Sequence, residues 1–247
     1  MECMMWHVAN AGVILSTDEH TLIGIDCFCK DSKGVYEDTP SDIREELFRQ
    51  IEQGDIRSLV FTHEHEDHFC LEDVKEAWLR NVSLKIYGGN KVVEMLKALG
   101  VCETNLVTVT NGDKVQVETF QIDFLETVHE GARYTDVSNL ALLITVGEQK
   151  IVITGDAMPQ ESMFKQIAEW GKKIDGMLLP FPYMGLKSTR KLIEKHLDID
   201  KIFVLHQPRK DADEQDWIGS AKKVCENAND TLPFAFFPER IGKWYFI

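Results

Sequence analysis

The stretch that most constrains this chain is the sequence Thr-His-Glu-His-Glu-Asp-His at residues 62–68. It follows the apolar run 59–61, which predicts a buried strand, and it precedes the helical spacing of Leu71, Val74 and Trp78. The stretch is therefore expected on a turn between a strand and a helix. Imidazole and carboxylate groups are the usual ligands of zinc and also suit iron, nickel or manganese. Because clustered histidines and acids aimed one way need a cation between them, the stretch predicts a metal site rather than a solvated turn.

Three further metal-ligand candidates lie downstream, and each ends an apolar run. They are His129, Asp156 and His206. Open α/β sheets place their ligand sites beyond the carboxyl ends of their strands. These three side chains are therefore expected to converge with the cluster at residues 62–68.

The order of these residues resembles the metallo-β-lactamase superfamily. The pattern is H-x-H-x-D-H at residues 63–68, then a histidine, an aspartate after Thr-Gly, and a final histidine. Within that superfamily, segments 11–15, 25–26 and 178–180 are most similar to the metal-dependent hydrolases grouped with ascorbate-6-phosphate lactonase. The resemblance implies an α/β fold, a four-layer αβ/βα sandwich with its metals at one edge between the sheets.

The candidate ligands outnumber those that one tetrahedral zinc ion can use, so two divalent metal ions are expected. Zinc is the first expectation, with manganese or iron as alternatives. By resemblance, His63, His65 and His129 hold the first metal. Asp67, His68 and His206 hold the second, and Asp156 bridges the two. Asp67 and Asp156 are also expected to serve in catalysis.

The expected activity is that of a metal-dependent hydrolase of a small ester, lactone or phosphoester. A water held between two divalent cations loses its proton near neutral pH, and the resulting hydroxide is the expected nucleophile. His65 argues against the flavin-linked di-iron branch, which has a carboxylate there. Asp156 replaces the cysteine ligand of a true β-lactamase, and the 41 residues after His206 are too few for the helical domain of glyoxalase II. The alternatives are a nuclease similar to ribonuclease Z and a metal-binding protein without catalysis.

Composition and net charge restrict the number of domains and the class of binding partner. The 247 residues, 44% hydrophobic and 28% charged, fit one domain over residues 1–247. The net charge of −14 would repel a phosphate backbone, which disfavours nucleic acid and favours a small-molecule substrate. The sequence shows neither a signal-peptide pattern nor a membrane-length apolar run, and its six cysteines have no framework spacing. We therefore expect a cytoplasmic protein with reduced thiols and no membrane partner.

Hydrophobic periodicity predicts alternating strands and helices. Strands are predicted at residues 6–15, 21–28, 59–61, 82–87, 106–109, 115–120, 122–129, 140–146, 150–154, 176–180, 202–205, 234–237 and 243–247, with a polar turn at 16–20. Helices are predicted after the caps Ser41 and Asn90, from residue 71, near Pro159, over 188–197, and from Trp217. Asn111-Gly112 predicts a hairpin.

Several roles remain open on the sequence alone. Asp26 is either a residue that supports the metal ligands from behind or a strand-end turn residue. The segment 181–185 is either a buried connection or a wall of the substrate pocket. His7 and His196 are expected to be structural. Polar candidates near the pocket mouth are Arg133, Tyr134, Tyr183 and Lys187.

Overall fold

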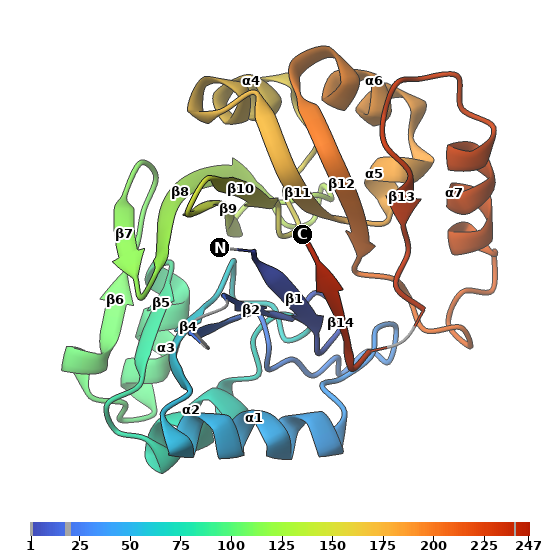
Figure 1. Cartoon of the computed structure of the whole chain (residues 1–247). Helices are drawn as coiled ribbons and strands as arrows, with labels where there is room; N and C mark the ends of the chain where they lie inside the picture. Colours follow the sequence, from blue (N-terminus) through green and yellow to red (C-terminus); the bar gives the residue numbers. More distant parts are fainter. Residues whose placement is uncertain (1, 18–20, 240) are drawn as a thin grey trace.

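Four layers make up the fold, as expected for an αβ/βα sandwich. The computed structural model describes residues 2–17, 21–239 and 241–247. Two mixed sheets stack on each other, and helices cover the outer face of each sheet (Figure 1). Residues 18–20 of the expected turn at 16–20 lie outside the described residues.

The first sheet comes from the N-terminal half of the chain and one C-terminal strand. Its order is β14 (Lys243–Phe246), β1 (Met4–His7), β2 (Val13–Ser16), β3 (Leu22–Ile25), β4 (Ile56–Val60), β5 (Lys85–Gly88) and β6 (Leu106–Thr108). Strands β3 to β6 run parallel, and the strands on the other side pair antiparallel.

The second sheet comes from the C-terminal half. Its order is β13 (Ala235–Phe236), β12 (Asp198–Leu205), β11 (Lys173–Pro180), β10 (Gln149–Ile153), β9 (Ser138–Val146), β8 (Phe120–Val128) and β7 (Lys114–Val117). Strands β10 to β12 run parallel, and β8 shares their direction because β9 is antiparallel to both β8 and β10.

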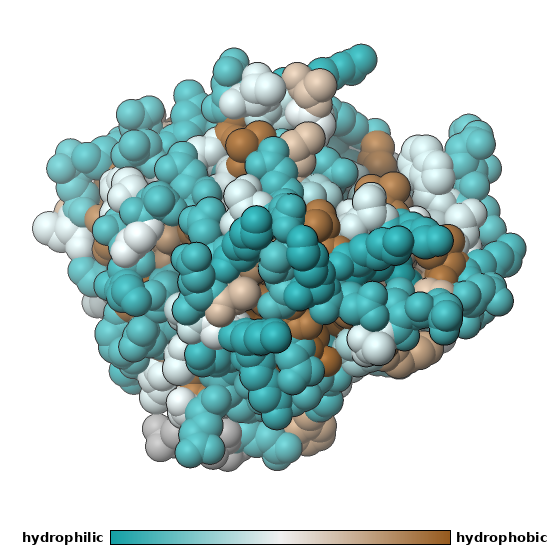
Figure 2. Space-filling model, turned by 90° about the horizontal axis from the view of Figure 1, so that it is seen from above, coloured by the Kyte–Doolittle hydropathy of each residue, from teal (hydrophilic) through white to brown (hydrophobic). Residues whose placement is uncertain are grey.

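Helices lie on the outer faces of both sheets. The first sheet carries α1 (Ser41–Gln53), α2 (Leu71–Arg80) and α3 (Asn90–Ala98), and the short 3-10 turn η1 (Glu103–Asn105) precedes β6. The second carries α4 (Glu161–Trp170), α5 (Pro182–Gly185), α6 (Lys187–His196) and α7 (Trp217–Glu226). Seen from the side of α4 and α6, the surface is mainly hydrophilic, with hydrophobic residues in small separate groups (Figure 2).

Alternation along the strands builds the core. Met5 and Leu15 point between the two sheets, whereas Trp6 and Ile14 point toward the helices of the first sheet. A third apolar cluster fills the space between the second sheet and its helices. This period-two pattern matches strands that are buried on both faces.

One predicted strand is a hairpin. The predicted strand over residues 6–15 is wrong, because β1 ends at His7 and β2 begins at Val13. The chain turns between them, where Val8 N and Ala9 N donate to Gly12 O at 3.0 and 3.3 Å. A Cβ at Gly12 would lie 2.4 Å from Asp26 O, so this turn packs against the next strand only with glycine.

The hairpin predicted at Asn111-Gly112 is also wrong. Strand β6 before it belongs to the first sheet, and β7 after it belongs to the second. The turn therefore carries the chain between sheets, with Gly112 at φ 84° and its N–H donating to Phe124 O at 2.8 Å. The hairpin lies further on, at residues 118–119, where Val117 pairs with Phe120.

The predicted helix caps are shifted by one residue. Pro40 and Gly89 occupy the N-cap positions of α1 and α3, so Ser41 and Asn90 are the first helical residues, without a side-chain cap. Gln160, not Pro159, precedes α4. No helix among the described residues is both long and apolar enough to cross a membrane, and the six cysteines form no disulfide.

Candidate metal centre

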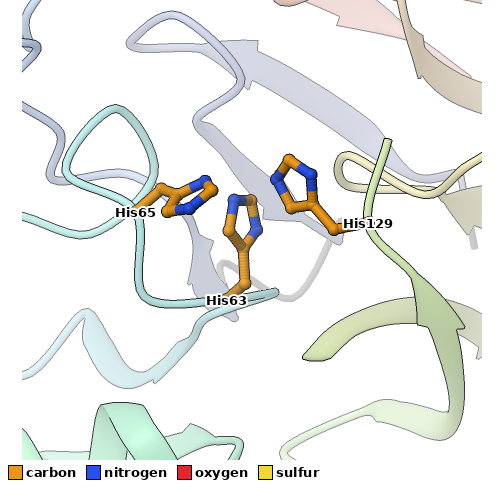
Figure 3. A group of neighbouring side chains, drawn as sticks. All are labelled: His63, His65 and His129. Carbon is orange, nitrogen blue, oxygen red and sulfur yellow. The ribbon is translucent and has the colours of Figure 1, made fainter. Parts of the chain in front are cut away.

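The carboxyl ends of strands in both sheets bring the seven expected ligands together in two groups. The first group consists of His63, His65 and His129. Figure 3 shows these three rings turned toward one another, two from the loop after β4 and one from the end of β8. The second group consists of Asp67, His68, Asp156 and His206, and within each group the ligand atoms lie within 4.8 Å of one another. The pattern at residues 62–68 and the three distant residues thus meet at one edge.

The hydrogen bonds of the first group fix its tautomers. Thr62 Oγ1 donates to Asp26 Oδ2 at 2.6 Å, so it can only accept from His63 Nδ1, which lies 3.1 Å away. His129 Nδ1 donates to Glu130 O at 2.6 Å. In the neutral form of both rings the Nε2 atom therefore carries the lone pair. These Nε2 atoms are buried without a hydrogen-bond partner, which is costly unless a cation accepts them. The donor set fits a divalent metal.

Asp156 reaches both groups. Its Oδ2 lies 3.6 Å from His129 Nε2 and 3.3 Å from His206 Nε2, and its Oδ1 lies 3.3 Å from His68 Nε2. His206 Nε2 is also 3.0 Å from Asp67 Oδ2. Asp156 does not cap α4, whose N-cap is Gln160. This is the position that a bridging carboxylate would need.

In the metal-free site, burial and neighbouring charges shift the pKa values of the histidines in opposite directions. Burial lowers the pKa of His63 well below its ordinary value, and the neighbouring His68 lowers it further. Burial also lowers the pKa of His65. Burial opposes the charging of His68, but Asp156 and Asp26 outweigh it and raise the pKa of His68 well above its ordinary value. Burial disfavours ionised Asp156, yet His206 and His68 hold the pKa of that carboxyl well below its usual range.

Asp26 supports the ligands from behind. It is 1% exposed, and its backbone has a φ of 46°, which is uncommon outside glycine. One carboxylate oxygen accepts from His68 Nδ1 at 2.9 Å, and the other accepts from Thr62 N at 2.9 Å. The carboxylate thus orients His68 directly and His63 through Thr62. Of the two roles left open for Asp26, the structure supports this one.

A buried asparagine shapes the turn that carries Asp156. Asn139 Oδ1 accepts from Asp156 N at 2.9 Å, and its Nδ2 donates to Thr154 O at 2.9 Å. Gly155, at φ 54°, passes so close that a Cβ there would lie 2.4 Å from Asn139 Oδ1. Sequence patterns indicated no supporting role for Asn139 or Thr62, because Asn139 bonds Asp156 and Thr62 bonds Asp26 across separate segments of the chain.

The candidate site opens into a pocket with a volume of about 260 Å³. Ligands of both groups line it, and the loop after β3 closes one side. The lining residues are Asp31, Lys33, Val35, Tyr36, His65, Glu66, Asp67, His129, Tyr134, Asp156 and His206. The sequence gave no reason to single out Lys33 or Tyr36, which stand on a loop without a motif.

Among the residues predicted near the mouth, only Tyr134 lines the pocket. Arg133 and Lys187 are exposed outside it. Tyr183 is fully buried, and its hydroxyl donates to Ala157 O, so segment 181–185 is a buried connection that includes α5. Tyr183 therefore supports the turn after Asp156 instead of forming a substrate wall.

The two histidines expected to be structural lie outside both groups. His196 Nε2 is 3.1 Å from Glu161 Oε1, which joins α6 to α4. His7 is buried in the first sheet, with Nε2 3.3 Å from Asn10 O.

The chain belongs to the β-lactamase superfamily, because the model of that superfamily's domain matches residues 25–211. No protein with a curated function matches the sequence.

Solved structures agree with this fold. The metallo-β-lactamase fold protein YhfI from Bacillus subtilis is 17% identical, with a TM-score of 0.69 and 99% of each chain covered. A Veillonella parvula protein described as a possible metal-dependent hydrolase is 15% identical, with a TM-score of 0.73 and 99% of each chain covered. CmlA from Streptomyces venezuelae, a diiron β-hydroxylase, is 15% identical at a TM-score of 0.66. The match covers 100% of this chain and 54% of CmlA. At these identities the likeness shows the fold alone.

Proposed function

We propose that this protein is a metal-dependent hydrolase that cleaves a small-molecule ester, lactone or phosphoester at two divalent metal ions. The observation that carries the proposal is that both ligand groups open into the same pocket. A metal held only for structure is normally enclosed by protein ligands, whereas a catalytic metal keeps a position open to substrate. This distinguishes the proposal from a metal-binding protein without catalysis.

Two metal ions bound here would lower the pKa of a water molecule and polarise the attacked carbonyl or phosphoryl group. The protein's own residues do the positioning. His63 and His129 present Nε2 toward the first position. Asp156 reaches toward both positions, and Asp67 completes the second beside His206. Asp67 and Asp156 therefore have the candidate catalytic roles, because they set the charge and the separation of the two cations.

Zinc is the proposed metal, since the donors are nitrogen and oxygen and both groups are compact. Manganese and iron are compatible with the same donors. Lactone substrates are proposed from the similarity of three short segments to the hydrolases grouped with ascorbate-6-phosphate lactonase. That branch is narrower than the superfamily match, which extends over residues 25–211.

A nuclease similar to ribonuclease Z is the weaker proposal. The net charge of −14 opposes the phosphate contacts that dominate nucleic-acid affinity. The pocket, at about 260 Å³, is smaller than the 300–1,000 Å³ usual for drug-sized ligands. We therefore propose a small-molecule substrate, weak RNA binding at physiological salt, and a cytoplasmic site of action without a membrane partner.

The test is a hydrolysis screen of the protein loaded with zinc, manganese or iron. The panel contains small lactones, aryl esters, phosphomonoesters, phosphodiesters and thioesters. We expect turnover of at least one small ester, lactone or phosphoester, which chelation abolishes and added metal restores. Turnover confined to RNA would favour the nuclease. No turnover of any class by fully loaded protein would favour a metal-binding protein without catalysis.

A further inference from the structure

The loop at residues 31–38 is built as a rigid wall of the pocket. The carboxylate of Asp31 accepts hydrogen bonds from the backbone N–H groups of Lys33, Val35 and Tyr36 at 3.0, 2.6 and 2.8 Å. Asp31 N in turn donates to Asp38 Oδ1 at 2.7 Å. A carboxylate with several backbone partners fixes a local chain path. The loop therefore presents its side chains in a set direction.

This loop is tied, just before its start and at its middle, to segments that carry metal-ligand candidates. Lys30 N donates to Glu66 O at 2.7 Å, within the 62–68 stretch. Arg209 N donates to Val35 O at 2.8 Å, three residues after His206. The loop is thus placed against both ligand groups at once.

Two tyrosines line the pocket, and each packs against ligand candidates. The Tyr36 ring meets the His206 ring edge-on, with centroids 4.0 Å apart. The Tyr134 ring packs on His65 and His129, with centroids 4.9 and 5.0 Å away. The pocket therefore has a tyrosine ring beside each ligand group, Tyr36 at the second and Tyr134 at the first.

Lys33 is the cation of this pocket. Among the described lining residues it is the sole lysine or arginine. Its Nζ lies 3.5 Å from Tyr134 Oη and 5.8 Å from the centre of that ring. Lys33 forms no salt bridge among the described residues. An ammonium group at the rim of a site on an otherwise acidic protein can attract an anion.

We propose that the loop at residues 31–38 selects a small substrate with one anionic group away from the scissile bond. Lys33 binds that group, a carboxylate or a phosphate, at the rim, while the scissile bond lies between Tyr36 and Tyr134 over the two metal positions. The inference rests on the proposed function for the chemistry at the metals. The anion site itself depends on Lys33 and can be measured without turnover.

The experiment is calorimetric titration of the zinc-loaded protein with two ligands of equal length, succinate and its monoamide, succinamate. Each offers one carboxylate to the metals, and they differ in whether the far end is charged. A third ligand, 3-phosphonopropionate, places a phosphonate at the far end and separates a preference for phosphate from one for carboxylate. The variant is Lys33→Met, and the matched control is Lys30→Met, an exposed lysine just before the loop that does not line the pocket.

The expected result is that the wild type and Lys30→Met bind succinate or 3-phosphonopropionate about fivefold more tightly than succinamate, the size of one exposed charge interaction. Lys33→Met should bind all three alike. Equal affinities in the wild type, or a preference that Lys33→Met retains, would overturn the proposal. A Lys33-dependent preference in a protein that hydrolyses nothing would keep the anion site and overturn the proposed function. Hydrolysis without the Lys33-dependent preference would keep the proposed function and overturn the anion site.

Discussion

The two ligand groups are built differently, although they share one edge of the fold. The first group has three imidazoles and no carboxylate, and the Nε2 atoms of His63 and His129 are buried without a hydrogen-bond partner. The second group mixes carboxylates with imidazoles, and His206 pairs with Asp67 at 3.0 Å, although His68 Nε2 and Asp156 Oδ1 are also without a hydrogen-bond partner. The first group therefore contains no negative charge of its own, whereas the second has two carboxylates that can offset positive charge on its histidines.

The largest expected effect follows from the residue that the two groups share. Asp156→Asn keeps the size of the side chain but removes the charge, and an amide nitrogen is a poor metal ligand. We expect the variant to lose one metal equivalent and activity to fall by about a hundredfold or more. Elemental analysis and kcat/KM measure the two effects, and circular dichroism checks that the fold is retained.

A surface control separates this from general charge loss. Asp55→Asn removes a carboxylate outside both groups and should leave metal content and activity unchanged. If Asp156→Asn retains two metals and the parent rate, Asp156 does not join the groups and the shared-ligand comparison fails.

The sequence predicted which candidate ligands converge better than it predicted the residues that support them. The convergence could be predicted because H-x-H-x-D-H is contiguous and because His129, Asp156 and His206 each end an apolar run. Asn139 could not, because its bond to Asp156 N joins residues 17 positions apart in the sequence. The Asn111-Gly112 turn was misassigned because the same local turn chemistry suits a crossing between two sheets. Local pattern does not specify which strands become neighbours.

The second group should depend on Asp26 more than the first. Asp26 bonds His68 directly, and it reaches His63 only through Thr62. We expect Asp26→Asn to weaken one metal equivalent by about ten- to a hundredfold and the other much less, the range typical of partners behind metal ligands. Competition with a coloured chelator measures the two affinities. Equal weakening of both equivalents would show that the two groups are not supported separately.

A smaller effect, on stability, is expected from Tyr183, which supports the turn after Asp156. Tyr183→Phe removes the hydroxyl that donates to Ala157 O, next to Asp156. The carbonyl would lose a buried partner, so the free energy of unfolding should fall by about 1 to 2 kcal/mol, as measured by denaturant titration. Tyr87→Phe is the matched control, since the Tyr87 hydroxyl has no hydrogen bond among the described residues, and it should be nearly neutral. A loss in Tyr87→Phe as large as in Tyr183→Phe would contradict this role.

The smallest expected effects are opposite titrations in the metal-free protein. The pKa of His63 is lowered, so its neutral form stabilises the fold above about pH 6.5, and this contribution is lost as the pH falls toward the folded pKa. The pKa of His68 is raised, so its charged form stabilises the fold below about pH 6.5, and this contribution is lost as the pH rises through the folded pKa. Nitrogen-detected NMR of the imidazoles measures both, and titration of both rings near pH 6.5 would contradict the contrast.

The two-metal site is tested most directly by metal stoichiometry from elemental analysis, paired with the hydrolysis screen. We expect protein reconstituted with zinc, manganese or iron to bind up to two equivalents and to gain activity with them. We also expect His129→Ala and His206→Ala each to lose one equivalent. A wild-type protein that binds no metal after reconstitution, and shows no activity with any of the three, would contradict a two-metal hydrolase.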